Sequence, residues 1–197
     1  MTLSTVIKYQ VIMLTLQVVL YFGCEYFQKN PHDVARPLDE KIPVIPLFTL
    51  IYILWFPVIA LFPVHLFKAS YDLYRVYMLT WIIDLAASIA IYMLYPTTFE
   101  RPKNPTDYPG GWMLSFIYKS SYKGLNCMPS LHCSMSIMVL IFALLSGTLA
   151  LKLKVIYGAV ALGIIASTLF TKQHVVLDVV TGVLLGILSS LIAFAIL

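Results

Sequence analysis

The sequence is poor in charged residues. Asp, Glu, Lys and Arg make up 11% of 197 residues, whereas an ordinary soluble domain has roughly a quarter. The net charge of +4 is scattered over short polar segments, and no arginine-rich arm or basic stripe with interleaved aromatic residues is present. The sequence therefore argues against a water-soluble fold and against nucleic acid as a partner.

Cysteine is scarce as well. The three residues, Cys24, Cys127 and Cys133, do not have the spacing of a zinc finger, and an odd number cannot all pair. A disulfide between Cys24 and Cys127 is compatible with the order of the segments. Buried free thiols are the interpretation we favour, because unpaired cysteine is among the most buried residue types.

Hydrophobic residues, in contrast, make up 60% of the chain and fall into runs of about twenty. A run of that length crosses the hydrocarbon core of a bilayer as a helix. The predicted spans are 6–27, 47–67, 75–95, 130–150, 155–170 and 174–197. The first lacks the charged start, short apolar centre and cleavage site of a signal peptide, so we expect it to be retained. The fold class is all-α: a polytopic bundle of six transmembrane helices forming one domain, 1–197.

The predicted topology gathers the polar loops on one face. Six spans place both termini on one side, with the first, third and fifth loops on the other. The first loop, "QKNPHDVARPLDEKIPVIP", and the third, Pro96 to Pro129, are the long ones and should cap that face. Lys and Arg number eight on the capped side and five on the other. Since several of the eight look functional, charge alone leaves the orientation open.

Three polar clusters should meet at the capped face. "TTFERPK" carries Arg101, "CMPSLHCS" carries Ser130 and His132, and "STLFTKQHVVLD" carries His174 and Asp178. The first lies in the third loop, and the other two open the fourth and sixth spans. Topology alone therefore places all three on the same side of the membrane, where ionisable groups are retained only if something compensates their cost.

The residue types in these clusters suit phosphoryl transfer without a metal ion. A neutral His174 can attack phosphorus, and a carboxylate four residues later on a helix can hold its other ring nitrogen. His132 can protonate the departing oxygen. Arg101 offers a planar fork of donors for phosphoryl oxygens, and backbone N–H groups around Ser130 add donors at a helix start.

These clusters resemble the type-2 phosphatidic acid phosphatase superfamily of membrane lipid phosphatases. The family pattern is KxxxxxxRP, then PSGH, then SRxxxxxHxxxD, and this chain reads "LYPTTFERP", "PSLH" and "STLFTKQHVVLD" in the same order. The resemblance implies His174 as nucleophile, Asp178 as its partner, His132 as general acid, and Arg101 and Ser130 as phosphate ligands. The "YPTTFERP" and "KQHVVLD" forms are similar to the branch that includes inositol phosphorylceramide synthases, which are transferases.

Two basic residues of the family pattern are replaced here. Leu94 stands at the lysine position of the first block and Thr168 at the arginine position of the third. A phosphoryl group carries about two negative charges, so another cation should compensate. Lys172, two residues before His174, is the first candidate and Lys103 the second. The other loop lysines are expected to be solvated.

Two other classes of function remain open from the residues. A transporter can use histidine and carboxylate as a proton relay, although such sites lie near the bilayer midplane. A zinc site would need a tetrahedral set drawn from Cys127, Cys133, His132 and His174, whose spacing matches no familiar pattern. Asp84, alone in the third span, is expected to bond a neighbouring helix.

We therefore expect a membrane lipid phosphatase that uses no metal ion and no cofactor. Its substrate would be a lipid phosphate or diphosphate, because little loop is available to enclose a water-soluble molecule. Transfer to an alcohol acceptor is the alternative outcome of the same chemistry. Membrane lipids are the other expected partners, and we expect the cell membrane as the location, with the site on the extracytoplasmic face.

Overall fold

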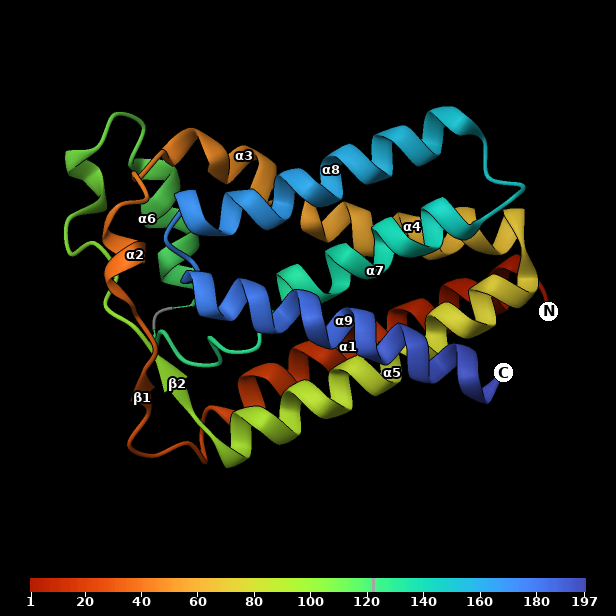
Figure 1. The fold of residues 1–197 in the computed structure, drawn as a ribbon, viewed down its shortest axis with the longest axis horizontal. Coiled ribbons are helices and arrows are strands. Elements are labelled where there is room, and N and C mark those ends of the chain that lie inside the picture. The colour runs from red at the N-terminus through yellow and green to blue at the C-terminus, as the bar shows by residue number, and fades with distance from the viewer. Residues whose placement is uncertain (122) are drawn as a thin grey trace.

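The computed structural model describes residues 1–121 and 123–197. Within these described residues, six longer helices run side by side (Figure 1). They are α1 (Leu3–Cys24), α4 (Trp55–Ala69), α5 (Tyr71–Leu94), α7 (Leu131–Leu145), α8 (Leu151–Phe170) and α9 (Val176–Ile196). Shorter elements are β1 (His32–Asp33), α2 (Pro37–Glu40), η1 (Pro46–Phe48), α3 (Thr49–Tyr52), β2 (Thr97–Thr98), η2 (Pro105–Asp107) and α6 (Trp112–Ser120). The protein is thus all-α, as predicted.

Within the described residues, five helical stretches are long and apolar enough to cross a membrane. They contain α1, α4, α5, α8 and α9, with η1, α3 and α4 forming one stretch, Pro46–Ala69. The chain is a multi-pass membrane protein. The helices that contain the predicted spans 75–95 and 155–170 begin a few residues earlier, because α5 starts at Tyr71 after a Ser70 cap, and α8 includes Lys152 and Lys154 in its first turn.

The predicted fourth span, 130–150, is too long. Its helix, α7, has 15 residues, about 22 Å at 1.5 Å per residue. Ser146 leaves the helix with extended backbone, and its hydroxyl accepts the N–H of Leu149 at 3.1 Å. Helix α7 packs against α4, α5, α8 and α9 and is the central helix of the bundle. Because these neighbours separate α7 from the lipid, α7 does not have to match the thickness of the bilayer core.

The core confirms the expected role of Asp84. Its carboxylate, fully buried in α5, accepts a hydrogen bond from the Ser134 hydroxyl of α7 at 2.8 Å. The same helix, α5, buries the large side chains of Tyr77 and Trp81 in the core. Asp84 therefore joins α5 to the first turn of α7 within the core.

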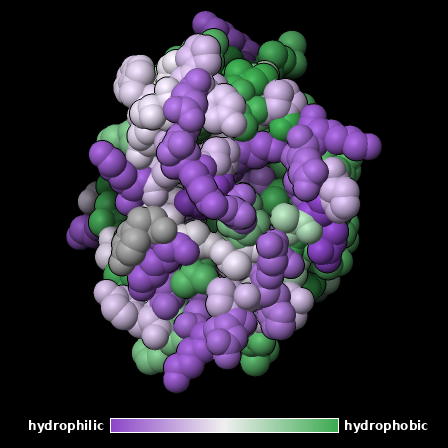
Figure 2. Space-filling model, turned by 90° about the vertical axis from the view of Figure 1, so that its left-hand side faces the viewer, coloured by the Kyte–Doolittle hydropathy of each residue, from purple (hydrophilic) through white to green (hydrophobic). Residues whose placement is uncertain are grey.

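One end of the bundle carries the polar loops and the other carries both termini (Figure 1). The loop-bearing end is covered mainly by hydrophilic side chains (Figure 2). There the first and third loops are joined by a short parallel pairing of β1 with β2, His32 opposite Thr97 and Asp33 opposite Thr98. The predicted arrangement, with two long loops capping one face, is confirmed.

Candidate active site

The segment before α7 positions the first histidine. Ser130 has extended backbone, and its hydroxyl accepts the N–H of Cys133 at 3.3 Å, so that the helix begins at Leu131. His132 therefore lies in the first turn, as predicted. Its ring packs against the rings of Trp55 and Tyr52, with centroids 4.3 Å and 4.5 Å away. Its buried Nε2 has no hydrogen-bond partner among the described residues.

The second histidine precedes its helix. Helix α9 starts at Val176, so His174 lies two residues before it, and the expectation that His174 and Asp178 are neighbours on a helix is wrong. Their contact still forms: His174 Nδ1 is 3.2 Å from Asp178 Oδ2. The same carboxylate oxygen accepts the N–H of Val175 at 3.1 Å and so caps the helix. Asp178 thereby holds Nδ1 and leaves Nε2 of His174 for chemistry.

Two glycines allow the helices that carry these residues to meet. A Cβ at Gly182 would lie 2.5 Å from the carbonyl oxygen of Ser130, and one at Gly186 would lie 2.5 Å from that of Ser134. The small-xxx-small pair therefore lets α9 pack directly on the backbone of α7. The histidine rings lie 5.8 Å apart between centroids.

The hydroxyl and the backbone N–H of Ser130 are both engaged in hydrogen bonds within the protein. It is fully buried, and its backbone N–H donates to the carbonyl of Asp178 at 3.1 Å. Its hydroxyl is occupied by the cap of α7. Ser130 lines neither of the two cavities described below. In this structure it fixes the two helix starts relative to each other, and its role toward phosphate stays a prediction.

Arg101 follows β2 and is oriented by the third loop. Its guanidinium donates to the carbonyl and hydroxyl of Ser121 at 2.8 Å and 3.0 Å and lies over the ring of Tyr118, 5.3 Å from the centroid. Burial raises the pKa of Tyr118 to about 12 against the opposing effect of Arg101. The neutral phenol donates to the carbonyl of Thr171 at 2.9 Å, which ties α6 to the loop before His174.

The candidate lysines differ in their surroundings. The Lys172 ammonium donates to the carbonyl of Asp39 at 2.6 Å, and burial lowers its pKa below 10.5 while Asp39 opposes that shift. Lys103 pairs with Glu100 at 3.1 Å, with 84% of its side chain exposed. Both lysines line the same cavity as His174. Lys119 is exposed on α6 and lines neither cavity.

Asp39, in the first loop, is a site residue that the sequence reasoning missed. Its side chain is buried, one oxygen accepts the N–H of Val176 at 2.8 Å, and the other accepts that of Arg36 at 2.7 Å. Its backbone carbonyl also accepts a hydrogen bond from Lys172, so Asp39 contacts residues on both sides of His174 in the sequence. The signal in the sequence was "RPLDEK", where a proline opens a short helix and an acidic residue follows in its first turn.

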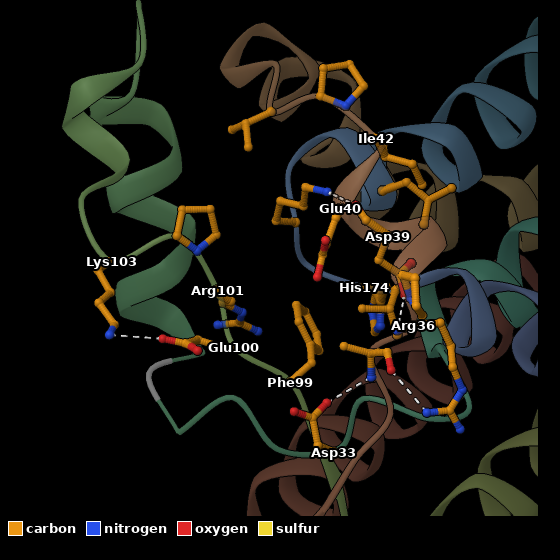
Figure 3. Close-up of a pocket in the computed structure, with 18 of the residues that line it drawn as sticks. Asp33, Arg36, Asp39, Glu40, Ile42, Phe99, Glu100, Arg101, Lys103 and His174 are labelled. Carbon is orange, nitrogen blue, oxygen red and sulfur yellow. Dashed lines mark hydrogen bonds and ion pairs between the residues drawn. The ribbon is translucent and has the colours of Figure 1, made fainter.

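The larger of two cavities is polar and opens at the loop-bearing end. Its volume is about 1200 Å³. The first loop and α2 form one wall, the segment after β2 another, and the loop before α9 the floor (Figure 3). Its charged lining residues are of both signs: the basic ones are Arg36, Arg101, Lys103 and Lys172, and the acidic ones are Asp33, Asp39, Glu40, Glu100 and Asp107. Donors for an anion are therefore present beside His174, at Arg101 and Lys172.

The smaller cavity, of about 330 Å³, lies among the helices. Its outer lining includes the apolar side chains of Val18, Phe22, Phe56 and Phe116, which are 53%, 43%, 57% and 70% exposed. They belong to α1, α4 and α6. Since α1 and α4 belong to the membrane-crossing stretches, this side of the cavity faces lipid.

The inner end of the apolar cavity is polar. It is lined by Arg101, His132, Gln173 and His174. Three buried nitrogens there, Nε of Arg101 and Nε2 of both His132 and Gln173, have no hydrogen-bond partner within the described part of the chain. Arg101 and His174 line both cavities, and His132 lines only the apolar one. The two cavities therefore meet at the groups with phosphoryl-transfer chemistry.

The cysteines and the zinc alternative can now be placed. Cys24, Cys127 and Cys133 are buried free thiols, as favoured above. Burial raises the pKa of Cys127, so it stays protonated near neutral pH. Among residues 1–121 and 123–197, no group of three or more His, Cys, Asp or Glu side chains could hold a metal ion. The four-residue zinc set considered from the sequence is not assembled there.

The fold and the site together define a multi-pass membrane protein with paired histidines, a carboxylate and an arginine on one face. A family model, described as the PAP2 superfamily, matches residues 77–197, which is more than half of the chain. The chain belongs to this superfamily of type-2 phosphatidic acid phosphatases, and so it is an enzyme of the phosphatase or phosphotransferase type that acts on lipid phosphates. Comparison with curated proteins and with solved structures gives no match.

Proposed function

We propose that the protein hydrolyses a lipid phosphate or diphosphate through a phosphohistidine on His174. The observation that carries this proposal is the meeting of a polar and an apolar cavity at Arg101 and His174. A lipid phosphate has the same division, with a charged end that needs donors and a chain that needs an apolar wall. The lipid-facing side of the smaller cavity gives that chain a place without leaving the bilayer.

The geometry supports a two-step reaction. His174 Nε2 attacks phosphorus while Asp178 holds Nδ1–H and stabilises the cation that develops. His132 donates a proton to the departing lipid oxygen, and the phosphorus–oxygen bond breaks. The centroids of the two histidine rings are 5.8 Å apart, so both rings can reach one phosphoryl group placed between them, given contact distances of about 3 Å. His132 then takes a proton from water as the phosphorus–nitrogen bond breaks.

Arg101 is positioned to bind phosphoryl oxygens. Its guanidinium is fixed by Ser121 and Tyr118, so little side-chain freedom is lost when it binds an anion. Lys172 adds a second positive charge on the side of the polar cavity. Donors arranged in advance around developing charge are commonly the largest single contribution to catalysis.

Transfer to an alcohol is the second candidate function. It uses the same first step, with an alcohol in place of water in the second. The size of the polar cavity favours it, since about 1200 Å³ exceeds what a phosphoryl group alone requires. Assays with and without alcohol acceptors separate the two outcomes.

Phosphate labelling tests the proposed function directly. The purified protein should take up label from a ³²P-lipid phosphate in an acid-labile, base-stable form, as a phosphohistidine does. His174→Ala should abolish both labelling and turnover, and vanadate should inhibit. Turnover should also persist in excess chelator. Near-normal activity of His174→Ala would overturn the mechanism, and complete loss in chelator that a divalent ion restores would overturn metal independence.

A further inference from the structure

The loop before α9 carries a second polar side chain next to His174. Gln173 is 4% exposed, and it lines the inner end of the apolar cavity together with His132 and His174. Its backbone N–H donates to the carbonyl of Thr168 at 3.0 Å, and the N–H of His174 donates to the same carbonyl at 3.1 Å. The same turn of backbone therefore fixes both residues, and the fold sets the position of Gln173 relative to the proposed nucleophile.

The side-chain amide of Gln173 is paired at one end only. Its Oε1 accepts the hydroxyl proton of Ser121 at 3.2 Å, whereas its buried Nε2 has no hydrogen-bond partner among residues 1–121 and 123–197. A buried N–H group without an acceptor costs free energy, and most such groups in folded proteins are paired. A ligand in the cavity can supply the acceptor that this amide lacks.

Ser121 connects this amide to Arg101. The guanidinium of Arg101 donates to the carbonyl and hydroxyl oxygens of Ser121, and the same hydroxyl donates to Gln173. Nε of Arg101 is also buried and unpaired in the described part of the chain, and Arg101 lines the same cavity. The third loop thus holds two donor side chains next to His174. Donors fixed in this way are suited to bind the oxygens of an anion.

The position that the family pattern fills with arginine does not supply such a donor here. Thr168 is fully buried, and its hydroxyl donates to the carbonyl of Ile165 at 2.7 Å. Thr168 lines neither cavity. Gln173, five residues later and on the cavity wall, is placed to provide the missing donor.

We propose that Gln173 is a catalytic residue whose Nε2 donates a hydrogen bond to a phosphoryl oxygen that Arg101 also binds. This inference rests on the proposed function, because it takes His174 as the nucleophile and a phosphoryl group as the ligand. The amide transfers no proton: it stays neutral and donates to an oxygen on which negative charge develops as His174 attacks. It extends the proposed function by adding a donor for the transition state.

Vanadate tests this donor whichever lipid is the substrate. Orthovanadate mimics five-coordinate phosphorus, so the groups that stabilise the transition state should bind it. Full-length protein in nanodiscs is titrated with orthovanadate, and the affinity is obtained from the shift in thermal unfolding. Gln173→Met keeps the length of the side chain and removes the amide. It should weaken vanadate binding at least tenfold and slow ³²P labelling from a lipid phosphate about a hundredfold.

Two control variants test whether the effect belongs to this amide. Gln10→Met removes an amide that is also 4% exposed, lies outside both cavities and donates to the carbonyl of Ile59 at 2.7 Å. It should leave the vanadate affinity within twofold. Ser121→Ala removes the hydroxyl that holds Gln173 but keeps the carbonyl that Arg101 uses, so it should cost less than Gln173→Met. Equal losses in these two variants would show that Gln173 acts only through Ser121 and would overturn the inference.

The outcomes also separate this inference from the proposed function. Vanadate binding that is lost in His174→Ala but unchanged in Gln173→Met overturns the inference and supports the proposed phosphatase. Gln173→Glu keeps the acceptor for Ser121 and removes the donor, so wild-type affinity in that variant overturns the inference even if Gln173→Met does not fold.

Two further results are decisive. If labelled His174 forms at the wild-type rate in Gln173→Met and then accumulates, the amide acts on the attacking water of the second step, and the inference is overturned. If the wild-type protein neither binds vanadate nor takes up label from any lipid phosphate, the proposed function and the inference both fail.

Discussion

The two regions of this molecule, residues 1–76 and 77–197, contribute differently to one site. The second region matches the family model and carries Arg101, His132, His174 and Asp178. The first lies outside that match and supplies walls: Asp39 and Glu40 on the polar cavity, and Val18, Phe22 and Phe56 on the apolar one.

This difference separates the residues proposed for catalysis from those that would determine which lipid is bound. The groups that we propose for the reaction at phosphorus lie in the part that matches the family model, and the class of enzyme follows from that part. The surfaces that would contact a head group or a lipid chain are formed by residues of both regions. A change in the first loop or in α1 can therefore alter which lipid is accepted while the reacting groups remain.

The largest expected effect lies in the second region. Asp178→Asn removes the charge that stabilises the His174 cation and weakens control of its tautomer, so turnover should fall by about 10⁴-fold, as for the comparable change in a serine protease triad. The amide oxygen can still accept the N–H of Val175, so the cap of α9 should largely persist. Steady-state kinetics and thermal unfolding of the purified variant check both parts. Activity within tenfold of the wild type would remove Asp178 from the chemistry.

A second prediction concerns the replaced basic residues. Lys172→Ala should lower kcat about a hundredfold, the effect expected when a transition-state contact is lost. Lys119→Ala removes the same charge from an exposed site outside both cavities and should be nearly silent. Equal, small effects at the two positions would show that Lys172 only anchors the loop, and Lys103 would then be the residue to substitute.

Asp39 tests whether the first region also supports the chemistry. Asp39→Ala leaves the N–H groups of Val176 and Arg36 without their acceptor, and we expect a loss of about tenfold in kcat and about 1 kcal/mol of stability, as for a lost helix cap. Asp39→Asn keeps one acceptor oxygen and should recover most of both. If Asn and Ala behave alike in kcat and in thermal unfolding, Asp39 does not act through these hydrogen bonds.

The smallest expected effect is a shift in pH dependence. The pKa of Lys172 is lowered below 10.5, so its proton is lost earlier than from a free lysine as the pH rises. Activity should therefore decline on the alkaline side below that value. Lys172→Arg keeps its charge to higher pH, and the alkaline limb should move upward. A limb that does not move would assign this titration to another group.

Much of the placement of the candidate site could be predicted from the sequence, because its residues lie near helix starts or in a long loop on one face. Arg101, His132, His174 and Asp178 follow from motif order and topology. The reason given for the His174–Asp178 contact was wrong, since the helix begins after His174 and Asp178 reaches back as a cap. A two-residue shift in a helix start depends on which residue caps the helix, and helix ends are commonly uncertain by one or two residues.

The sequence by itself determined the helical membrane fold, the face that carries the loops and the class of chemistry. Hydrophobic runs and short loops permit few topologies, because an unpaired backbone cannot lie in lipid. Only the tertiary structure decided that Asp39 holds the loop of His174 from 135 positions away, that α7 is short and enclosed, and that two cavities meet at Arg101 and His174. Those features depend on how side chains distant in the chain pack together, and no local pattern records that packing.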